Sequence, residues 1–192
     1  MSLAPWRSPL TLALDRNSLT YARYLQLATV RADGRPANRT LVFRGFLEDT
    51  NQLKFVIDAR SQKVDQIEQQ PWAEACWYFP ETREQFRITG SLTLVGTEHT
   101  DSTLQQVRVS TWQELSNAAR LQFVWPHPGQ PRADATAFDS PVPDTAEPLP
   151  NFCLLLLEPI QVDHLELRGQ PQNRWLYNQD SHSAWYTQAI NP

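Results

Sequence analysis

A strand, a turn, a second strand and a short helix follow one another between residues 39 and 71, and this order constrains the fold most. The first apolar run lies between Arg39 and Arg44, and the second covers Leu53 to Asp58. The helix after it has Ser61 as its predicted N-cap and ends at Pro71, because proline cannot continue a helix. Two strands joined by a short turn are typical of an antiparallel sheet.

The start of this helix is a candidate seat for a phosphate. Arg60 and Lys63 supply positive charge there, and the first N–H groups of a helix have no partners within the helix. An ordinary capped surface helix with solvated cations has the same pattern. The segment alone therefore leaves both interpretations open.

Short strands account for most of the remaining chain. Helices are expected only over residues 8–25, with Ser18 as an N-cap, and over residues 112–125, where Pro126 ends the helix. An Asp-Gly turn at residues 33–34 predicts a hairpin. Six or more strands with few helices predict a mainly β, antiparallel barrel with peripheral helices, in a single domain over residues 1–192. The predicted strands cover residues 25–31, 39–47, 53–58, 73–79, 85–95, 152–157, 160–167 and 174–177.

Residues 126–150 form the longest stretch without periodicity. This stretch holds seven of the 15 prolines, so we expect a long loop, ordered in part by packing against a partner subunit.

Composition excludes several classes of function. The net charge is −4, whereas a nucleic-acid binder usually presents a basic stripe. The longest apolar run, Phe152 to Leu157, is too short to span a bilayer. No leader segment is evident, and Cys76 and Cys153 resemble small buried hydrophobic residues. We therefore expect a cytoplasmic protein with no membrane or nucleic-acid partner. The four histidines lack metal-type spacing, so we expect no metal site.

Several polar residues could face a ligand, although each has an ordinary structural explanation. Arg39 and Arg44 are five positions apart, which puts them on opposite faces of a regular strand. Gln85 opens a strand, where its amide could bind ligand carbonyls. Arg174 begins an aromatic strand, where it could fix charge beside a ring or stack on Trp175.

Four motifs in collinear order together resemble one family. They are Arg-x-x-x-x-Arg at residues 39–44, Phe-x5-Ser-x-Lys-x-x-Gln-Ile-x3-Pro at 55–71, Gln-x4-Gly at 85–90 and Arg-Trp-Leu-Tyr at 174–177. The chain resembles the pyridoxamine 5′-phosphate oxidase family, and most closely its divergent branch of related FMN-binding proteins. The resemblance implies a split β-barrel that binds FMN at a homodimer interface and has oxidoreductase chemistry.

The resemblance also implies roles for individual residues. Arg39, Ser61 and Lys63 are expected at the FMN phosphate, and Arg174 is expected to reach the cofactor across the dimer. Trp125 or Gln130 falls in the segment expected to approach the partner's flavin. The substrate-side candidates are Arg44, Arg120 and His164, and no catalytic residue is assigned. The full set of implied cofactor residues is Arg39, Thr40, Leu41, Val42, Val56, Ile57, Arg60, Ser61, Gln62, Lys63, Gln85 and Arg174.

The departures from the family pattern lie mainly on the substrate side. Gln62 stands where the oxidases have a basic residue, and Arg60 could compensate for it. Gln170 and Gln172 replace the Arg-x-His substrate pair. The leading expectation is an FMN-dependent oxidoreductase with an altered substrate site. The alternatives are an FMN-binding, sensing or carrier protein that does not turn over pyridoxamine phosphate, and a barrel that has lost its flavin.

Overall fold

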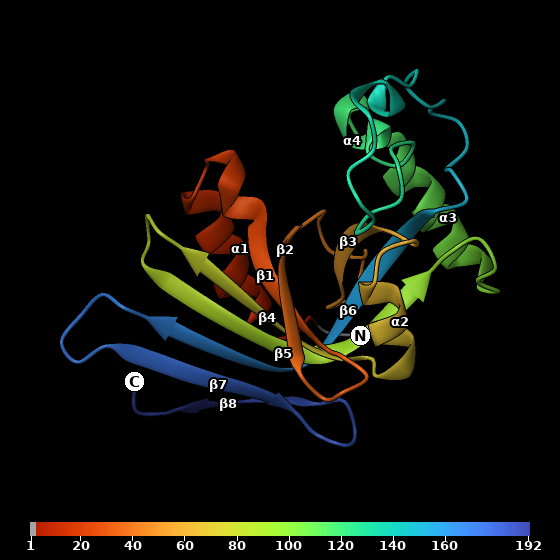
Figure 1. Ribbon diagram of the computed structural model, residues 1–192. Coiled ribbons are helices and arrows are strands. Elements are labelled where there is room, and N and C mark those ends of the chain that lie inside the picture. Colours follow the sequence, from red (N-terminus) through yellow and green to blue (C-terminus); the bar gives the residue numbers. More distant parts are fainter. Residues whose placement is uncertain (1–2) are drawn as a thin grey trace.

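Eight strands form one antiparallel sheet, and this sheet is the body of the protein (Figure 1). The computed structural model describes residues 3–192. The strand order is β2-β1-β4-β5-β6-β7-β8, and β3 pairs with β6 away from this path. The strands are β1 Tyr24–Val30, β2 Pro36–Val42, β3 Leu53–Asp58, β4 Trp72–Phe79, β5 Glu84–Val95, β6 Phe152–Glu166, β7 Asn173–Gln179 and β8 Trp185–Ala189.

The long strand β6 joins the two parts of the sheet. Its first residues, Phe152 to Leu157, pair with β3, and its last residues, Gln161 to Glu166, pair with β7. β5 pairs with β6 over nearly its whole length. The expected mainly β, split-barrel fold is confirmed. Two strands, over residues 152–157 and 160–167, were predicted where β6 is one.

Pro159 is accommodated because the pairing with β5 is irregular at this point. The register shifts between Thr89 and Gly90, and proline is tolerated at such positions. The close approach of the two strands also requires the glycine, since a Cβ at Gly90 would lie 2.0 Å from the carbonyl oxygen of Glu158.

The helices differ from the prediction at several boundaries. They are α1 Arg7–Arg16, α2 Lys63–Gln69, α3 Ser102–Gln113 and α4 Asn117–Leu121, with short 3₁₀ turns at Thr20–Arg23 and Ala135–Phe138. Ser18 is not an N-cap, because α1 has already ended at Asn17 and the next turn has Leu19 at its cap.

The predicted helix over residues 112–125 was also wrong. That stretch holds only the end of α3 and the whole of α4, whose N-cap is the Ser116 hydroxyl. The start of α3 was missed, although Asp101 caps it by accepting hydrogen bonds from the N–H groups of Thr103 and Leu104. Figure 1 shows α3, α4 and the loop after them gathered on the side of the molecule where β3 lies.

Two strand predictions need correction as well. β2 ends at Val42 rather than at residue 47, because Gly45 has a φ of 101°, and only Phe46 pairs again, with Leu53. β8 was not predicted, and its burial pattern shows why, because four of its five residues are exposed.

Buried and exposed residues alternate along the strands, and the buried ones form the main core. Trp77 of β4 is fully buried, and its indole N–H donates to the carbonyl of Ala22 at 2.8 Å. Cys153 is 3% exposed, as expected of a small buried residue, whereas Cys76 is only half-buried, on the other face of the sheet. A second cluster, formed by Trp112, Leu115, Phe123 and Phe152, fixes α3 and α4 against the start of β6.

No helix within residues 3–192 has the length and apolar character needed to cross a membrane.

Candidate functional site

A cleft of about 560 Å³ lies between the β2–β3 strands and the segment that runs from α4 into the long loop. The loop was expected to pack against a partner subunit. In the structure the first part of this loop forms one wall of the cleft within the same chain. Its packing against a partner stays a prediction. Eight of the residues implied at the cofactor or substrate line this cleft: Thr40, Leu41, Val42, Arg44, Val56, Ile57, Arg60 and Lys63.

Arg39 lies behind the cleft rather than in its lining. Its guanidinium donates to the carbonyl of Leu27 at 3.2 Å, to the hydroxyl of Thr29 at 2.6 Å and to the side chain of Gln66 at 3.1 Å. Arg44 does line the cleft. Arg44 lies beyond the end of β2 at Val42, so the alternation that predicted opposite faces for the two arginines does not extend to it.

Lys63 sits where α2 begins, and Ser61 holds it there. The ammonium donates to the Ser61 hydroxyl oxygen at 2.8 Å, and that hydroxyl donates to the carbonyl of Asp58 at 2.6 Å. Ser61 is therefore not the N-cap that was predicted. Gln62 occupies that position, and its side chain makes no capping hydrogen bond.

The electrostatics at Lys63 favour an anion. Burial lowers the pKa of the Lys63 ammonium, and the charge of Arg39 lowers it further. Within residues 3–192 neither cation has a carboxylate partner. The carboxylate close to Lys63, that of Asp58, is paired with Arg60, so the charges of Lys63 and Arg39 remain in excess. This excess fits the phosphate of FMN, which would gain a charge-assisted hydrogen bond from Lys63.

The Arg60 side chain is held in place by hydrogen bonds to residues of the cleft wall. Its guanidinium binds both oxygens of Asp58, with Nη2 2.6 Å from Oδ2 and Nε 3.0 Å from Oδ1. It also donates to the carbonyls of Trp125 at 3.1 Å and Phe123 at 3.3 Å, which ties the loop to β3. Burial pushes the pKa of Asp58 upward, but the hydrogen bonds from Arg60 outweigh this and leave that pKa below its usual range.

Gln85 and Arg174 lie away from the cleft, on the outer face of the sheet. The register places both opposite Leu165 of β6, so they share one row across three strands. Arg174 binds Asp163 through Nε at 3.0 Å and Nη2 at 2.7 Å, and Arg87 of β5 binds the same carboxylate. Burial alone would raise the pKa of Asp163, but the two arginines hold it below its usual range.

Arg87 and Asp163 were not singled out from the sequence. The signal that was available is their alternation, because Arg87 follows Gln85 by two positions on a predicted strand and so shares its face. Asp163 could be placed beside them only once the register between β5 and β6 was known.

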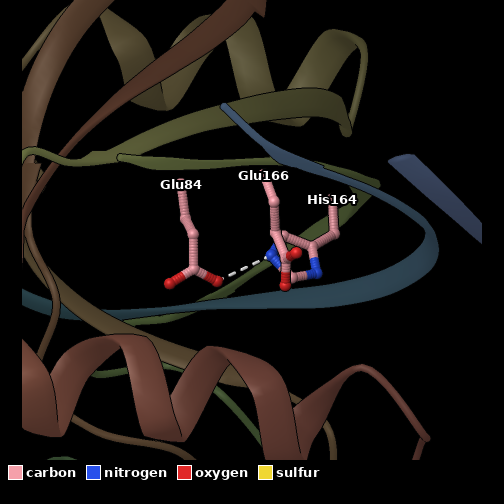
Figure 2. A group of neighbouring side chains, drawn as sticks. All are labelled: Glu84, His164 and Glu166. Atoms are coloured by element: carbon pink, nitrogen blue, oxygen red, sulfur yellow. Dashed lines mark hydrogen bonds and ion pairs between the residues drawn. The ribbon is translucent and has the colours of Figure 1, made fainter. Parts of the chain in front are cut away.

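His164 lies on the opposite face of β6 from Asp163. It is 2% exposed and stacks on Phe86 with ring centroids 4.0 Å apart. Figure 2 shows its ring nitrogen Nε2 turned toward Glu84, whose carboxylate oxygen lies 2.8 Å away, with Glu166 alongside. The structure therefore does not bring this substrate-side candidate to the cleft.

The group in Figure 2 contains metal-ligand types of side chain. One potential ligand atom from each of Glu84, His164 and Glu166 lies within 4.8 Å of the others. The imidazole nitrogen already has Glu84 as its partner, and Arg16 and Arg168 line the small cavity beside the two carboxylates. The absence of a metal stays a prediction.

Arg120, the other substrate-side candidate, does not line the cleft either. It is buried, and its guanidinium binds the carbonyl of Leu115 and the side chain of Asn117. These contacts hold the connection between α3 and α4. The sequence also missed residues of the long loop that line the cleft, among them Arg132 and Phe138.

Comparisons with known proteins agree with the predicted family resemblance. Residues 3–96 match the family model described as the pyridoxamine 5′-phosphate oxidase, FMN-binding domain. The chain is 37% identical to pyridoxine/pyridoxamine 5′-phosphate oxidase 2 of Arabidopsis thaliana, over 99% of this chain and 98% of that protein.

Two solved structures are similar over nearly their whole length. A pyridoxamine 5′-phosphate oxidase-related, FMN binding protein from Nostoc punctiforme PCC 73102 is 66% identical, with a TM-score of 0.97 over 100% of both chains. PhzG from Burkholderia lata 383, solved with tetrahydrophenazine-1-carboxylic acid, is 20% identical, with a TM-score of 0.76 over 97% of this chain and 89% of that one. The second likeness concerns the fold alone.

Proposed function

Because the chain belongs to the pyridoxamine 5′-phosphate oxidase, FMN-binding domain family, with FMN as the cofactor, we propose that it acts as a homodimeric FMN-dependent oxidoreductase. The observation that carries this proposal is that Lys63 lines a cleft with apolar strand residues, forms no ion pair with a described residue and has the charge of Arg39 behind it. Bound FMN supplies the redox chemistry, and the residues of the chain bind and orient it.

Within this proposal, Lys63 and Ser61 hold the phosphate, and Arg39 contributes positive charge from behind them. Val42 and Val56 line the cleft and offer an apolar surface to the flavin ring, and the Ile57 side chain lies behind them in the core. Arg60 acts through the loop, because its hydrogen bonds fix the carbonyls of Phe123 and Trp125.

The proposed dimer follows from the separation of the expected cofactor residues into two groups. Gln85 and Arg174 do not line the cleft, although the register puts them on the sheet face that also carries Thr40 and Val42. This face exposes Tyr24 by 44% and Tyr78 by 43%. In a two-fold dimer the same patch is used by both copies, so each chain could present Gln85 and Arg174 to its partner's cleft.

A second candidate function is FMN binding, sensing or transfer without oxidation of pyridoxamine phosphate. Arg120 is engaged by α3 and α4, and the turn between β6 and β7 carries the uncharged Gln170 and Gln172. These residues give the cleft no additional cation for a substrate phosphate.

The test starts with the visible absorbance spectrum of the purified protein and its mass in solution. We expect bound flavin and a dimer, and a protein without flavin would overturn both candidates. Hydrogen peroxide release under air, with pyridoxamine 5′-phosphate and pyridoxine 5′-phosphate, then separates them. Peroxide supports the oxidase, whereas a flavin-loaded protein that is silent with both supports the second candidate.

A further inference from the structure

A separate cavity of about 590 Å³ lies between α1, the turn that follows this helix and the corner after β2. Its volume falls within the range of small-molecule sites. It shares no lining residue with the cleft between β2, β3 and the long loop. Figure 1 shows α1 apart from α3 and α4, which stand on the side of that cleft. The two hollows are therefore independent places on the molecule.

One face of α1 forms a polar wall of this cavity. Arg7, Thr11 and Asp15 line it, and residues four positions apart lie on the same side of a helix. Another face of the helix is fixed in the core, where Trp6 and Leu10 are fully buried. The packing of the core thus sets the direction in which the polar residues of α1 face the cavity.

Arg7 is a partly desolvated cation without a counter-ion. Its Cζ lies 3.4 Å from the ring centroid of Phe46, and its Nη1 donates to the carbonyl of Thr50. Its Nε is buried and has no hydrogen-bond partner within residues 3–192. No carboxylate of these residues pairs with the guanidinium, and burial lowers the pKa of Arg7 below its ordinary value. Charges removed from water are normally paired, so this arginine lacks an anion.

The cavity as a whole carries an excess of positive charge. Arg23 also lines it, and Asp15 is its one acidic lining residue. Neither Arg23 nor Asp15 forms an ion pair with any residue of 3–192. Two arginines and one aspartate leave one net positive charge, and a concave site of this kind attracts anions. The hydroxyl-bearing residues Thr11 and Thr20 add further hydrogen-bonding groups to the lining.

We propose that this cavity binds a small organic anion, whose carboxylate or phosphate group accepts hydrogen bonds from Arg7 and Arg23. Planar guanidinium groups match both kinds of oxyanion. Phe46 and the carbonyl of Thr50 hold the guanidinium of Arg7 in place, so little order has to be gained when the anion binds. The inference goes beyond the proposed function and does not depend on it, because no residue of the cavity lines the cleft.

Calorimetry on the protein with FMN in excess tests this proposal, because FMN then occupies the phosphate seat proposed at Lys63. Three probes separate the sources of the anion: citrate carries carboxylates, glycerol 3-phosphate carries a phosphate, and glycerol carries no charge. We expect at least one anionic probe to bind more tightly than glycerol. Arg7→Gln and Arg23→Gln should each weaken that probe on the order of tenfold, as for a lost hydrogen bond from a charged group.

Asp15→Asn should have the opposite effect. It removes the one negative charge of the lining, so the anionic probe should bind on the order of twofold to fivefold more tightly. A merely structural role of these residues would not produce a gain. Asp15 and Arg23 are exposed and form no ion pair, so both variants should stay folded and carry the test if Arg7→Gln does not fold.

Arg16→Gln is the matched control. Arg16 is an exposed arginine of the same helix and lies outside this cavity, so the affinity for the anionic probe should not change. A loss in this variant equal to that in Arg23→Gln would show that the probe responds only to the overall charge of the protein, and would overturn the site.

Two further results would overturn the inference. One is that neither anionic probe binds more tightly than glycerol. The other is that Arg23→Gln and Asp15→Asn both leave the affinity unchanged, because the anion then lies elsewhere. Both results leave the proposed FMN site intact, whereas a protein without bound flavin counts against the proposed function and not against this cavity.

Discussion

Asp163 holds Arg174 through both oxygens of its carboxylate, with Nε 3.0 Å from Oδ1 and Nη2 2.7 Å from Oδ2. Asp163 is 7% exposed and also binds Arg87. One carboxylate between two guanidinium groups leaves a single net positive charge on this part of the outer face. The orientation of Arg174, the residue implied at the cofactor, thus depends on an aspartate from the neighbouring strand.

We expect Asp163→Asn to weaken FMN binding and to lower the stability of the protein. The neutral amide cannot balance two guanidinium groups, and the loss of hydrogen bonds to charged partners typically costs about 1.5–3 kcal/mol. FMN titration and thermal melts measure the two effects. Asp33→Asn is the control, because Asp33 makes only an exposed pair with Arg35. Unchanged FMN affinity would show that the ion pair between Asp163 and Arg174 does not support FMN binding.

Arg60→Ala should loosen the loop that forms one wall of the cleft. The substitution removes the hydrogen bonds to Phe123 and Trp125 and leaves Asp58 without its cation. We expect faster amide hydrogen exchange over residues 122–130 and weaker FMN binding. If FMN affinity fell while exchange in this segment stayed the same, Arg60 would be a direct phosphate ligand rather than a support for the loop.

The local parts of the fold could be predicted from the sequence, whereas the contacts between distant strands could not. The hairpin around Asp33 and Gly34 and the passage from β3 into α2 depend on alternation and turn residues within a short window. The sharing of Asp163 by Arg87 and Arg174 depends on the register of β5, β6 and β7. No local pattern encodes that register.

The cofactor half of the site was predicted better than the loop half. Thr40, Val42, Val56, Ile57 and Lys63 do line one cleft. Strand alternation puts Thr40 and Val42 on one face of β2, and the turn after β3 brings Lys63 to the same cleft. The loop residues gave no periodic signal, since irregular backbone lacks a repeat that would assign its side chains to a face. Arg120 and His164 were substrate-side candidates because of their positions in the sequence. Both side chains are buried, and their polar groups bind other residues of the protein.

Stability should fall as the pH is lowered, with His164 contributing to the loss. Burial lowers the pKa of the imidazole below its ordinary value, although Glu84, Glu166 and Asp163 oppose the shift. The unfolded chain, with a histidine pKa of about 6.5, then binds a proton more readily than the folded protein, so acid favours unfolding.

His164→Gln provides the comparison, because glutamine can donate to Glu84 but does not titrate. We expect the melting temperature of the unsubstituted protein to fall more than that of the variant between about pH 8 and about pH 5. Groups that titrate in both proteins cancel in this difference. A difference that stays constant with pH would show that His164 is not the group responsible.

Lys63→Ala combined with Arg39→Ala should abolish FMN binding, because it removes both cations at the proposed phosphate seat. The lost charge-assisted hydrogen bond from Lys63 is worth about 1.5–3 kcal/mol, and the lost charge of Arg39 adds to it, so we expect FMN affinity to fall by at least about tenfold. Lys63→Ala alone separates this loss from unfolding. Since burial and Arg39 already disfavour the charged ammonium, removing it should leave the melting temperature of the FMN-free protein unchanged or higher. The rise in melting temperature on adding FMN should shrink, because ligand stabilisation follows affinity. A folded double variant with undiminished FMN content would refute the phosphate site.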